Sequence, residues 1–170
     1  IASDHNDAML QQLEKRFPAG VSIQKIDLVH QLPFRDSSID GITANLVLPY
    51  VVHHQGIFGV SGYKKLLGDI YRVLRKNGVL IWSTPKENVK FIMAFLQSLP
   101  SILRGDQREN LIYGPRILGQ ALQIQKKGRR GVYHFLRRKE LIALLEEVGF
   151  RDIRVDRSMA GQVYVIGCIK

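Results

Sequence analysis

The sequence predicts a single α/β domain over residues 1–170, built as a three-layer α/β/α sandwich whose mostly parallel sheet ends in an antiparallel C-terminal strand. Three observations lead to this class. Helix-like and strand-like segments alternate along the first half of the chain, which favours parallel strands covered on both faces. The last two strand-like segments are joined by a link too short for a crossover. Hydrophobic residues make up 45% of the chain, enough for a core.

The first half of the chain supplies the start of this alternation. Residues 7–16 are predicted to be a helix, because an acidic residue lies in the first turn and two basic residues lie in the last. Residues 21–27 alternate between apolar and polar side chains, which is typical of a strand. A second strand is expected over residues 39–48, running into a loop.

The middle of the chain continues the pattern. Residues 61–76 have apolar side chains at helical spacing, and we expect this helix to end at the Lys-Asn-Gly of residues 76–78. Residues 79–85 form a strand that a proline stops, and residues 87–99 form a strongly apolar helix.

The C-terminal part closes the domain. Residues 103–134 give no clear pattern. Residues 137–147 are amphipathic and precede Gly149, which predicts a helix with a glycine cap. Residues 151–157 and 162–170 read as two strands, and we expect them to pair antiparallel.

Charge is concentrated in one segment. The chain carries a formal net charge of +10, and residues 103–139 hold ten basic residues opposed by two acidic ones. A local excess of this kind favours an anionic partner. The single cysteine, Cys168, is expected to be buried in the last strand, and no cluster of zinc ligands occurs, so no metal is predicted.

Targeting signals are not evident in the sequence. Residues 1–20 lack a basic region followed by an apolar run, and no run reaches the roughly 18 apolar residues of a membrane span. Together with the lone cysteine, this predicts a cytoplasmic protein.

Several motifs follow one another in a specific order. They are Asp-His-Asn-Asp-Ala-Met-Leu at 4–10, Asp27-Leu28 followed by Leu-Pro-Phe at 32–34 and Ser-Ile-Asp at 38–40, Asn-Leu-Val-Leu at 45–48, Arg-Val-Leu-Arg-Lys-Asn-Gly at 72–78, and Leu-Leu-Glu-Glu-Val-Gly-Phe at 144–150. In this order they resemble class I S-adenosylmethionine-dependent methyltransferases of the small-molecule type. The resemblance covers nearly the whole chain except residues 103–134, and it implies a Rossmann-like fold and S-adenosylmethionine as cofactor.

The resemblance assigns the ribose end of the cofactor to the first motif. Asp4 matches the acid that ends the family's second strand, and a carboxylate can accept from both ribose hydroxyls. The alternative is that Asp4 only caps the helix at 7–16. His5 would lie beside the adenine, or else be a solvated loop histidine.

The second and third motifs carry the other ends of the cofactor. By resemblance, Asp27 accepts from the adenine amino group, and the backbone N–H of Leu28 donates to a ring nitrogen. The alternative is an exposed aspartate at a strand end. Two departures from the family pattern are an extra residue before Leu32 and Ile39 in place of an aromatic. Asn45 and Leu46 match the turn that contacts the methionine part of the cofactor, which is a weak signal by itself.

The glycine-rich loop of the family has no counterpart in the sequence. The first strand and its G-x-G-x-G loop would lie just before residue 1, so we expect an N-terminally incomplete domain that belongs to a longer protein. A shortened relative that no longer methylates is the alternative. Gly56, Gly59 and Gly62 have a different spacing and are interpreted as a flexible connection.

The acceptor side is less defined. If a general base is used, His53 or His54 is the best candidate, with Tyr50 weaker; the alternative is a pair of loop histidines. Residues 87–134 lie where the family varies its substrate cover. They could form a lid over a small, lipophilic acceptor, contact an anionic membrane surface, or be a core helix followed by a solvated loop.

The function expected from the sequence is methyl transfer to a small molecule. The alternative is a non-catalytic module of the same fold that binds a membrane surface or a polyanion through its basic segment. Nucleic acid is the less favoured partner, because no nucleic-acid-binding motif is present. The sequence identifies neither the acceptor nor an oligomeric state.

Overall fold

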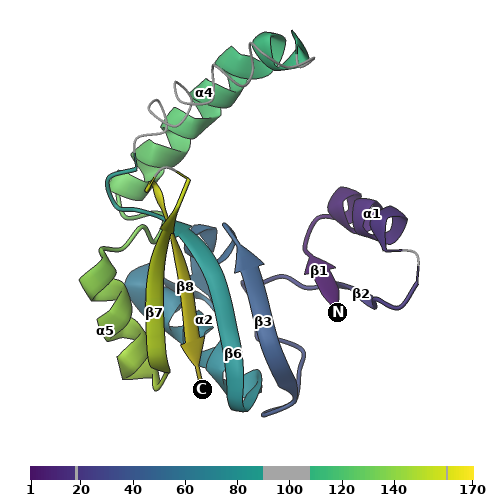
Figure 1. Cartoon of the computed structure of the whole chain (residues 1–170), viewed down its shortest axis with the longest axis vertical. Coiled ribbons are helices and arrows are strands. Elements are labelled where there is room, and N and C mark those ends of the chain that lie inside the picture. Colours follow the sequence, from purple (N-terminus) through teal and green to yellow (C-terminus); the bar gives the residue numbers. More distant parts are fainter. Residues whose placement is uncertain (18, 90–107, 160) are drawn as a thin grey trace.

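The computed structural model describes residues 1–17, 19–89, 108–159 and 161–170 (Figure 1). The N-terminal half contains β1 (Ala2–Asp4), α1 (Asp7–Arg16), β2 (Ile23–Lys25), β3 (Ile39–Asn45), the 3-10 helix η1 (Leu48–Tyr50), β4 (His53–His54), β5 (Ile57–Phe58) and α2 (Gly59–Val73). Then follow β6 (Leu74–Pro85), α4 (Arg108–Arg129), α5 (Arg138–Val148), β7 (Arg151–Ser158) and β8 (Val163–Ile169). Most of the helix predicted over residues 87–99 lies outside the described residues.

The main sheet is mixed and has the strand order β3-β6-β8-β7. β3 and β6 are parallel, while β8 runs antiparallel to both β6 and β7. The predicted α/β class is therefore confirmed, with its antiparallel strand at the C-terminal end. The expected pairing of the last two strands is present from Arg151↔Ile169 to Ser158↔Val163.

A second, two-stranded parallel sheet lies apart from the main one. β1 pairs with β2, and α1 packs on this pair to form an N-terminal unit of residues 1–25 (Figure 1). α1 has no buried residue, and no described residue of the unit belongs to the hydrophobic core. Among the described strands, β1 has no partner besides β2, and β3 has none besides β6. Each sheet thus has an open edge facing the other.

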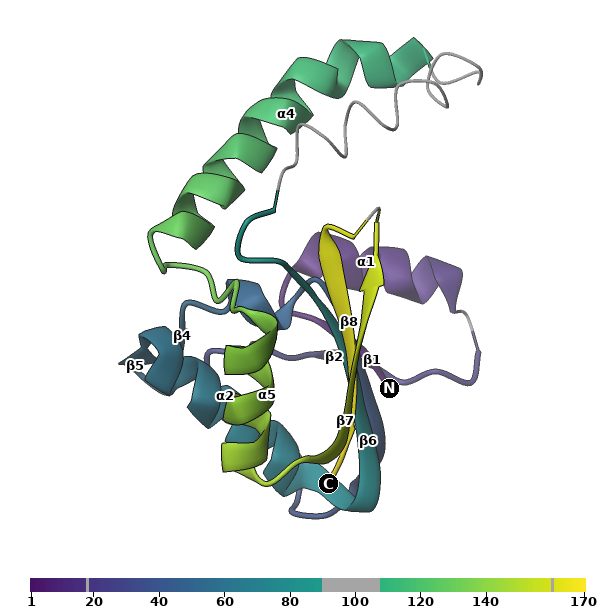
Figure 2. The ribbon, with the colours of Figure 1, turned by 60° about the vertical axis from the view of Figure 1, so that its left-hand side comes forward.

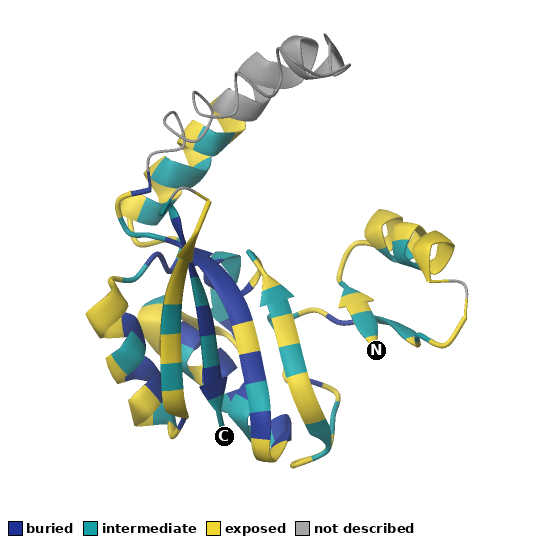
Figure 3. Cartoon of the chain, in the orientation of Figure 1, coloured by how far each residue is buried: buried dark blue, intermediate teal, exposed yellow. Residues whose placement is uncertain are grey.

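The core lies between the main sheet and two helices. α2 and α5 cover the same face of the sheet, as Figure 2 shows, and Figure 3 shows the buried residues gathered there. Leu66 and Leu67 of α2 and Leu145 of α5 are fully buried, as are Leu80 and Ile166 of the central strands. Burying each such side chain contributes roughly 1.5–3 kcal/mol, so this face accounts for most of the hydrophobic stabilisation of the domain.

The boundary between α2 and β6 differs from the prediction. The helix was expected to run to residue 76, but it ends at Val73, and Leu74 already pairs with Ile39 of β3. The C-terminus causes the change, because Asn77 donates its N–H to Lys170 O (3.1 Å) and Lys170 donates its N–H to Gly78 O (2.9 Å). Asn77 takes a left-handed φ of 64° in this turn. A tertiary contact here overrides the local helical pattern.

The glycines at 56, 59 and 62 do not form the flexible connection that the sequence suggested. Gln55 and Gly56, both with positive φ, make a two-residue turn between β4 and β5. Gly62 lies in α2 and packs directly under the resulting hairpin, where an added Cβ would lie 2.0 Å from Ile57 O. The segment is an ordered hairpin docked on a helix.

Cys168 is buried in β8, as predicted. Burial raises the pKa of its thiol to about 12. We therefore expect iodoacetamide at pH 8 to label the native chain at least roughly a hundredfold more slowly than the urea-unfolded chain, since the thiolate is the reactive form. Mass spectrometry against time measures both rates. Equal rates would show that β8 opens freely.

Helices of membrane-spanning length and hydropathy do not occur in the described part of the chain. Within the same residues, no three His, Cys, Asp or Glu side chains are grouped as they would be around a metal ion.

Candidate functional site

A hollow of about 1100 Å³ lies between the N-terminal unit and β3. It runs along the whole of β3 and also takes in the carboxyl end of β1 and the segment that follows β2. The carboxyl ends of the strands are the edge where ligands bind in open α/β sheets. The six residues predicted to bind the cofactor all line it: Asp4, His5, Asp27, Leu28, Asn45 and Leu46. The structure thus brings together three segments that are distant in the sequence. Their role as cofactor ligands stays a prediction.

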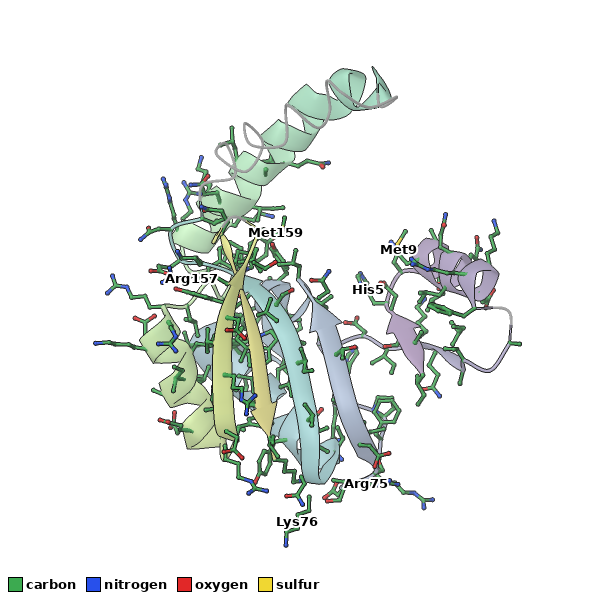
Figure 4. The ribbon with its side chains drawn as sticks, viewed as in Figure 1. His5, Met9, Arg75, Lys76, Arg157 and Met159 are labelled. Atoms are coloured by element: carbon green, nitrogen blue, oxygen red, sulfur yellow. The ribbon has the colours of Figure 1, made fainter. Side chains whose placement is uncertain are left out.

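Asp4 is the last residue of β1, and in the described part of the chain one oxygen of its carboxylate is free to accept a hydrogen bond from a ligand. Its Oδ1 accepts the N–H of Asn6 at 2.8 Å and lies 3.4 Å from Nδ1 of His5. The N-cap of α1 is Asn6, whose side chain accepts the N–H of Ala8 at 2.9 Å, so capping does not occupy Asp4. No contact among the described residues engages Oδ2 of Asp4. His5 lies on the side of the N-terminal unit that faces β3 (Figure 4).

The turn after β2 presents Asp27 and Leu28. Oδ1 of Asp27 accepts the N–H of Val29 at 3.1 Å, and Asp27 O accepts the N–H of His30 at 3.1 Å. These bonds close a tight turn. The N–H of Leu28 has no hydrogen-bond partner within the described part of the chain, so it can serve a ligand acceptor in the hollow.

The end of β3 is fixed by a residue that the sequence analysis missed. Ser83 of β6 lies beside Asn45 in register, donates its hydroxyl to Asn45 Oδ1 at 2.5 Å and accepts the N–H of Leu46 at 2.9 Å. Leu46 has a φ of 53°, an uncommon conformation for a residue other than glycine. Such strain concentrates at functional sites. The sequence did hold one sign of this role, because Ser83 is a polar residue near the end of an otherwise apolar strand.

The two histidines proposed as bases lie in different surroundings. His53 lines the hollow, packs 4.9 Å from Phe58 between ring centroids, and has a buried Nδ1 without a partner among the described residues. His54 is fully buried and does not line the hollow. Its Nδ1 lies 2.7 Å from Leu28 O and must carry the proton, because a carbonyl oxygen only accepts. A catalytic role for either stays a prediction.

Aromatic side chains border the hollow at η1. The ring of Tyr50 lies edge-on to Tyr133 at 5.0 Å and to Phe135 at 5.5 Å. Burial raises the pKa of the Tyr50 phenol, and the neighbouring Tyr133 adds to the effect. The segment after α4 therefore packs against one rim of the site, which places part of the predicted cover over residues 87–134 beside the hollow.

His134 fastens this segment to the rim. Its backbone N–H donates to Pro49 O at 2.8 Å, its Nε2 donates to Val51 O at 3.0 Å, and its ring stacks on Tyr63 at 4.7 Å. Desolvation lowers the pKa of His134 from its usual 6.5, although the bond to the Val51 carbonyl opposes the shift.

This lowered pKa predicts a pH dependence of stability. The unfolded chain binds a proton at residue 134 more readily than the folded chain. The contribution of His134 to the free energy of unfolding is therefore constant above about pH 6.5. As the pH falls below 6.5, the free energy of unfolding should decrease by at most about 1.4 kcal/mol per pH unit. Urea melts of the chain and of His134→Gln between pH 5 and 8 test this. An identical slope in both proteins would contradict the assignment.

Exposed basic residues flank residues 131–136, the segment beside this rim, in the sequence. The described ones are Lys126, Lys127, Arg129, Arg130, Arg137, Arg138 and Lys139. Lys127 lies 5.6 Å from the centroid of Tyr133. The basic residues at 104, 108 and 116 lie outside the described side chains.

Comparisons with known proteins agree with this arrangement. Residues 1–82 match the profile of the methyltransferase domain family. No curated protein matches the chain. Similar solved structures are a SAM-dependent methyltransferase from Thermotoga maritima described as a possible histamine N-methyltransferase (18% identity, TM-score 0.61), the CurJ carbon methyltransferase (16%, 0.62) and a putative S-adenosylmethionine-dependent methyltransferase from Listeria monocytogenes (14%, 0.61).

These likenesses extend along almost the whole chain. The matches cover 99%, 98% and 99% of it, respectively, but the chain spans 72%, 40% and 78% of the length of those proteins. At these identities the structures share the fold.

Proposed function

We propose that this chain, whose residues 1–82 match the methyltransferase domain family and whose fold is that of S-adenosylmethionine-dependent methyltransferases, transfers a methyl group from S-adenosylmethionine to a small acceptor. The resemblance inferred from the motifs is confirmed by the family match and the similar structures. The observation that carries the proposal is the convergence of three sequence-distant segments on one hollow.

The groups around the hollow suit the cofactor. Asp4 keeps a carboxylate oxygen for the ribose hydroxyls, and Asp27 with the unpaired N–H of Leu28 offers an acceptor and a donor to the adenine edge. The strained turn at Asn45 and Leu46 would face the methionine end. Each of these groups can pair with a complementary group of the ligand, which is the condition for burying polar atoms without a large desolvation cost.

The chemistry needs little from the protein beyond alignment. When bound, the cofactor supplies an electrophilic methyl group on a positively charged sulfur. The protein has to hold the acceptor atom in line with the methyl–sulfur bond and exclude water. Of the two histidines, His53 is the one that lines the hollow and could take a proton from the acceptor, because His54 is committed to Leu28 O.

The aromatic rim supports a small, lipophilic acceptor. Tyr50 lines the hollow and packs edge-on against Tyr133 and Phe135, and Val47 and Val52, which also line it, are 46% and 37% exposed. The positive charge of Lys127 above Tyr133 disfavours a cationic acceptor there. A panel of small neutral, anionic and cationic acceptors, scored by release of S-adenosylhomocysteine, tests this ranking; fastest turnover of a cationic acceptor would contradict it.

Calorimetric titration of S-adenosylhomocysteine into the full-length protein tests the main proposal. We expect saturable one-to-one binding, and at least roughly tenfold weaker binding of adenosine, which lacks the methionine end and so forgoes about 1.4 kcal/mol or more. Absence of binding by S-adenosylhomocysteine would contradict the proposal.

A second function is favoured by the basic group beside the rim. Seven exposed basic side chains between residues 126 and 139 could hold an anionic membrane surface or another polyanion without any methyl transfer. Vesicles with and without phosphatidylserine, tested with and without S-adenosylhomocysteine, separate the two functions. Binding to the charged vesicles with no response to S-adenosylhomocysteine would favour this second function.

A further inference from the structure

The segment between β2 and β3, residues 26–36, carries Asp27 and Leu28 but has no helix or strand of its own. We call it the Asp27 segment. Its shape is held largely by side chains of the β4–β5 hairpin and of α2. Three side chains provide this support, those of His54, Asp69 and Arg72, and none of them lines the hollow.

Asp69 of α2 is the centre of this support. Its side chain is only 5% exposed, and its Oδ2 accepts the N–H of Leu32 at 2.6 Å. Its Oδ1 accepts from Nε of Arg72 at 2.8 Å. A buried carboxylate is stable only when it is paired and hydrogen-bonded, so the position of Leu32 and the charge of Arg72 are tied to each other.

Arg72 binds the far half of the segment. Its Nη1 donates to Phe34 O at 2.9 Å and to Asp36 Oδ1 at 2.7 Å, and its Nη2 donates to Leu32 O at 3.1 Å. One rigid guanidinium therefore fixes three residues of an irregular segment, which the single point charge of a lysine could not do.

His54 binds the near half. Its Nδ1–H donates to Leu28 O at 2.7 Å, and its Nε2 accepts from the side-chain amide of Gln55 at 3.3 Å and lies 3.6 Å from Asp69 Oδ2. The neighbouring Gln55 donates its backbone N–H to Val29 O at 2.7 Å. The carbonyl of Leu28 is thereby held by the buried His54, while the Leu28 N–H, on the preceding peptide, has no partner in the described structure.

We propose that His54, Asp69 and Arg72 are positioning residues that hold the Asp27 segment in the conformation that binds the adenine end of the cofactor. This inference rests on the proposed function. His54 then acts as a positioning residue and not as a base. Arg72 then does more than form the junction between α2 and β6.

The test compares two arginine-to-lysine variants three residues apart. Arg72→Lys removes the guanidinium group whose several N–H donors hold the Asp27 segment. Arg75→Lys is the matched control, because Arg75 pairs with Asp40 at the start of β3, at 2.5 Å, and makes no contact with the segment. Asp69→Asn is the second variant, which keeps an oxygen for the Leu32 N–H but removes the charge that holds Arg72.

Two readouts are measured in the full-length protein, at a temperature well below the melting temperature of every variant. The first is the affinity for S-adenosylhomocysteine, and the second is amide hydrogen exchange over residues 28–34. We expect Arg72→Lys to weaken binding at least roughly tenfold and Asp69→Asn to weaken it in the same direction, with faster exchange confined to the segment. Arg75→Lys should change affinity less than about twofold.

The outcomes separate this inference from the proposed function. Binding by the unsubstituted protein with unchanged affinity in both Arg72→Lys and Asp69→Asn would overturn the inference alone. Equal losses in Arg72→Lys and Arg75→Lys, with exchange faster throughout the domain, would also overturn it, because the effect would be general destabilisation. No binding by the unsubstituted protein would overturn the proposed function and the cofactor role of the three residues with it.

Discussion

Replacing Asp4 by alanine is expected to weaken the binding of S-adenosylhomocysteine by about ten- to a hundredfold. The carboxylate has an oxygen with no partner in the described structure, and a hydrogen bond to a charged group contributes about 1.5–3 kcal/mol. Calorimetric titration of the variant measures the loss. The fold should be unaffected, since Asn6 and not Asp4 caps α1.

Asp7→Ala is the matched control for this change. Asp7 lies three residues away in the same unit and pairs with Lys25 at 2.7 Å, but it does not line the hollow. Its removal takes away the same charge and should leave the affinity within about twofold, because exposed pairs contribute little. A similar loss in both variants would mean that Asp4 acts only through general electrostatics. Unchanged affinity in both variants would show that Asp4 does not bind the ligand.

Replacing Gly62 by alanine should cause the largest loss of stability among single-methyl substitutions in α2. The new Cβ would lie 2.0 Å from Ile57 O and 2.8 Å from the Ile57 carbonyl carbon. Both are backbone atoms, so no change of side-chain rotamer can relieve the clash. The β4–β5 hairpin must move away from the helix. Overpacking of this kind costs about 1–3 kcal/mol, which urea denaturation can measure.

Gly68→Ala in the same helix is the comparison, with the opposite sign expected. No atom lies within 4 Å of its added Cβ, so only the backbone preference changes. Alanine in a helix interior is favoured over glycine by roughly 0.5–1 kcal/mol. If Gly62→Ala were as stable as Gly68→Ala, the close contact between the hairpin and α2 would not exist in solution.

The elements that could be predicted from the sequence are those with local signals. The helix at 7–16 begins and ends where the charges of its first and last turns placed it, and Gly149 caps α5 with a φ of 110°. The C-terminal strands have short links and alternating side chains, and their antiparallel pairing follows. Here the residues that determine an element lie inside it or next to it.

Elements set by distant contacts could not be predicted. The end of α2 depends on Lys170, and the turn at residues 75–78 depends on the same C-terminal residue, nearly a hundred positions away. The candidate site shows the same division. Motifs identified Asp4, Asp27 and Asn45, but Ser83 and the link from Asp69 to Leu32 join residues 37 or 38 positions apart that no local pattern connects.

The most direct test of the central claim is amide hydrogen exchange of the full-length protein with and without saturating S-adenosylhomocysteine. If one hollow holds the cofactor, the ligand should slow exchange together in three separate segments, around residues 4–6, 27–30 and 45–47, and leave the basic residues 126–139 unchanged. Binding without protection in these segments, or protection confined to the basic residues, would contradict the account and place the ligand elsewhere.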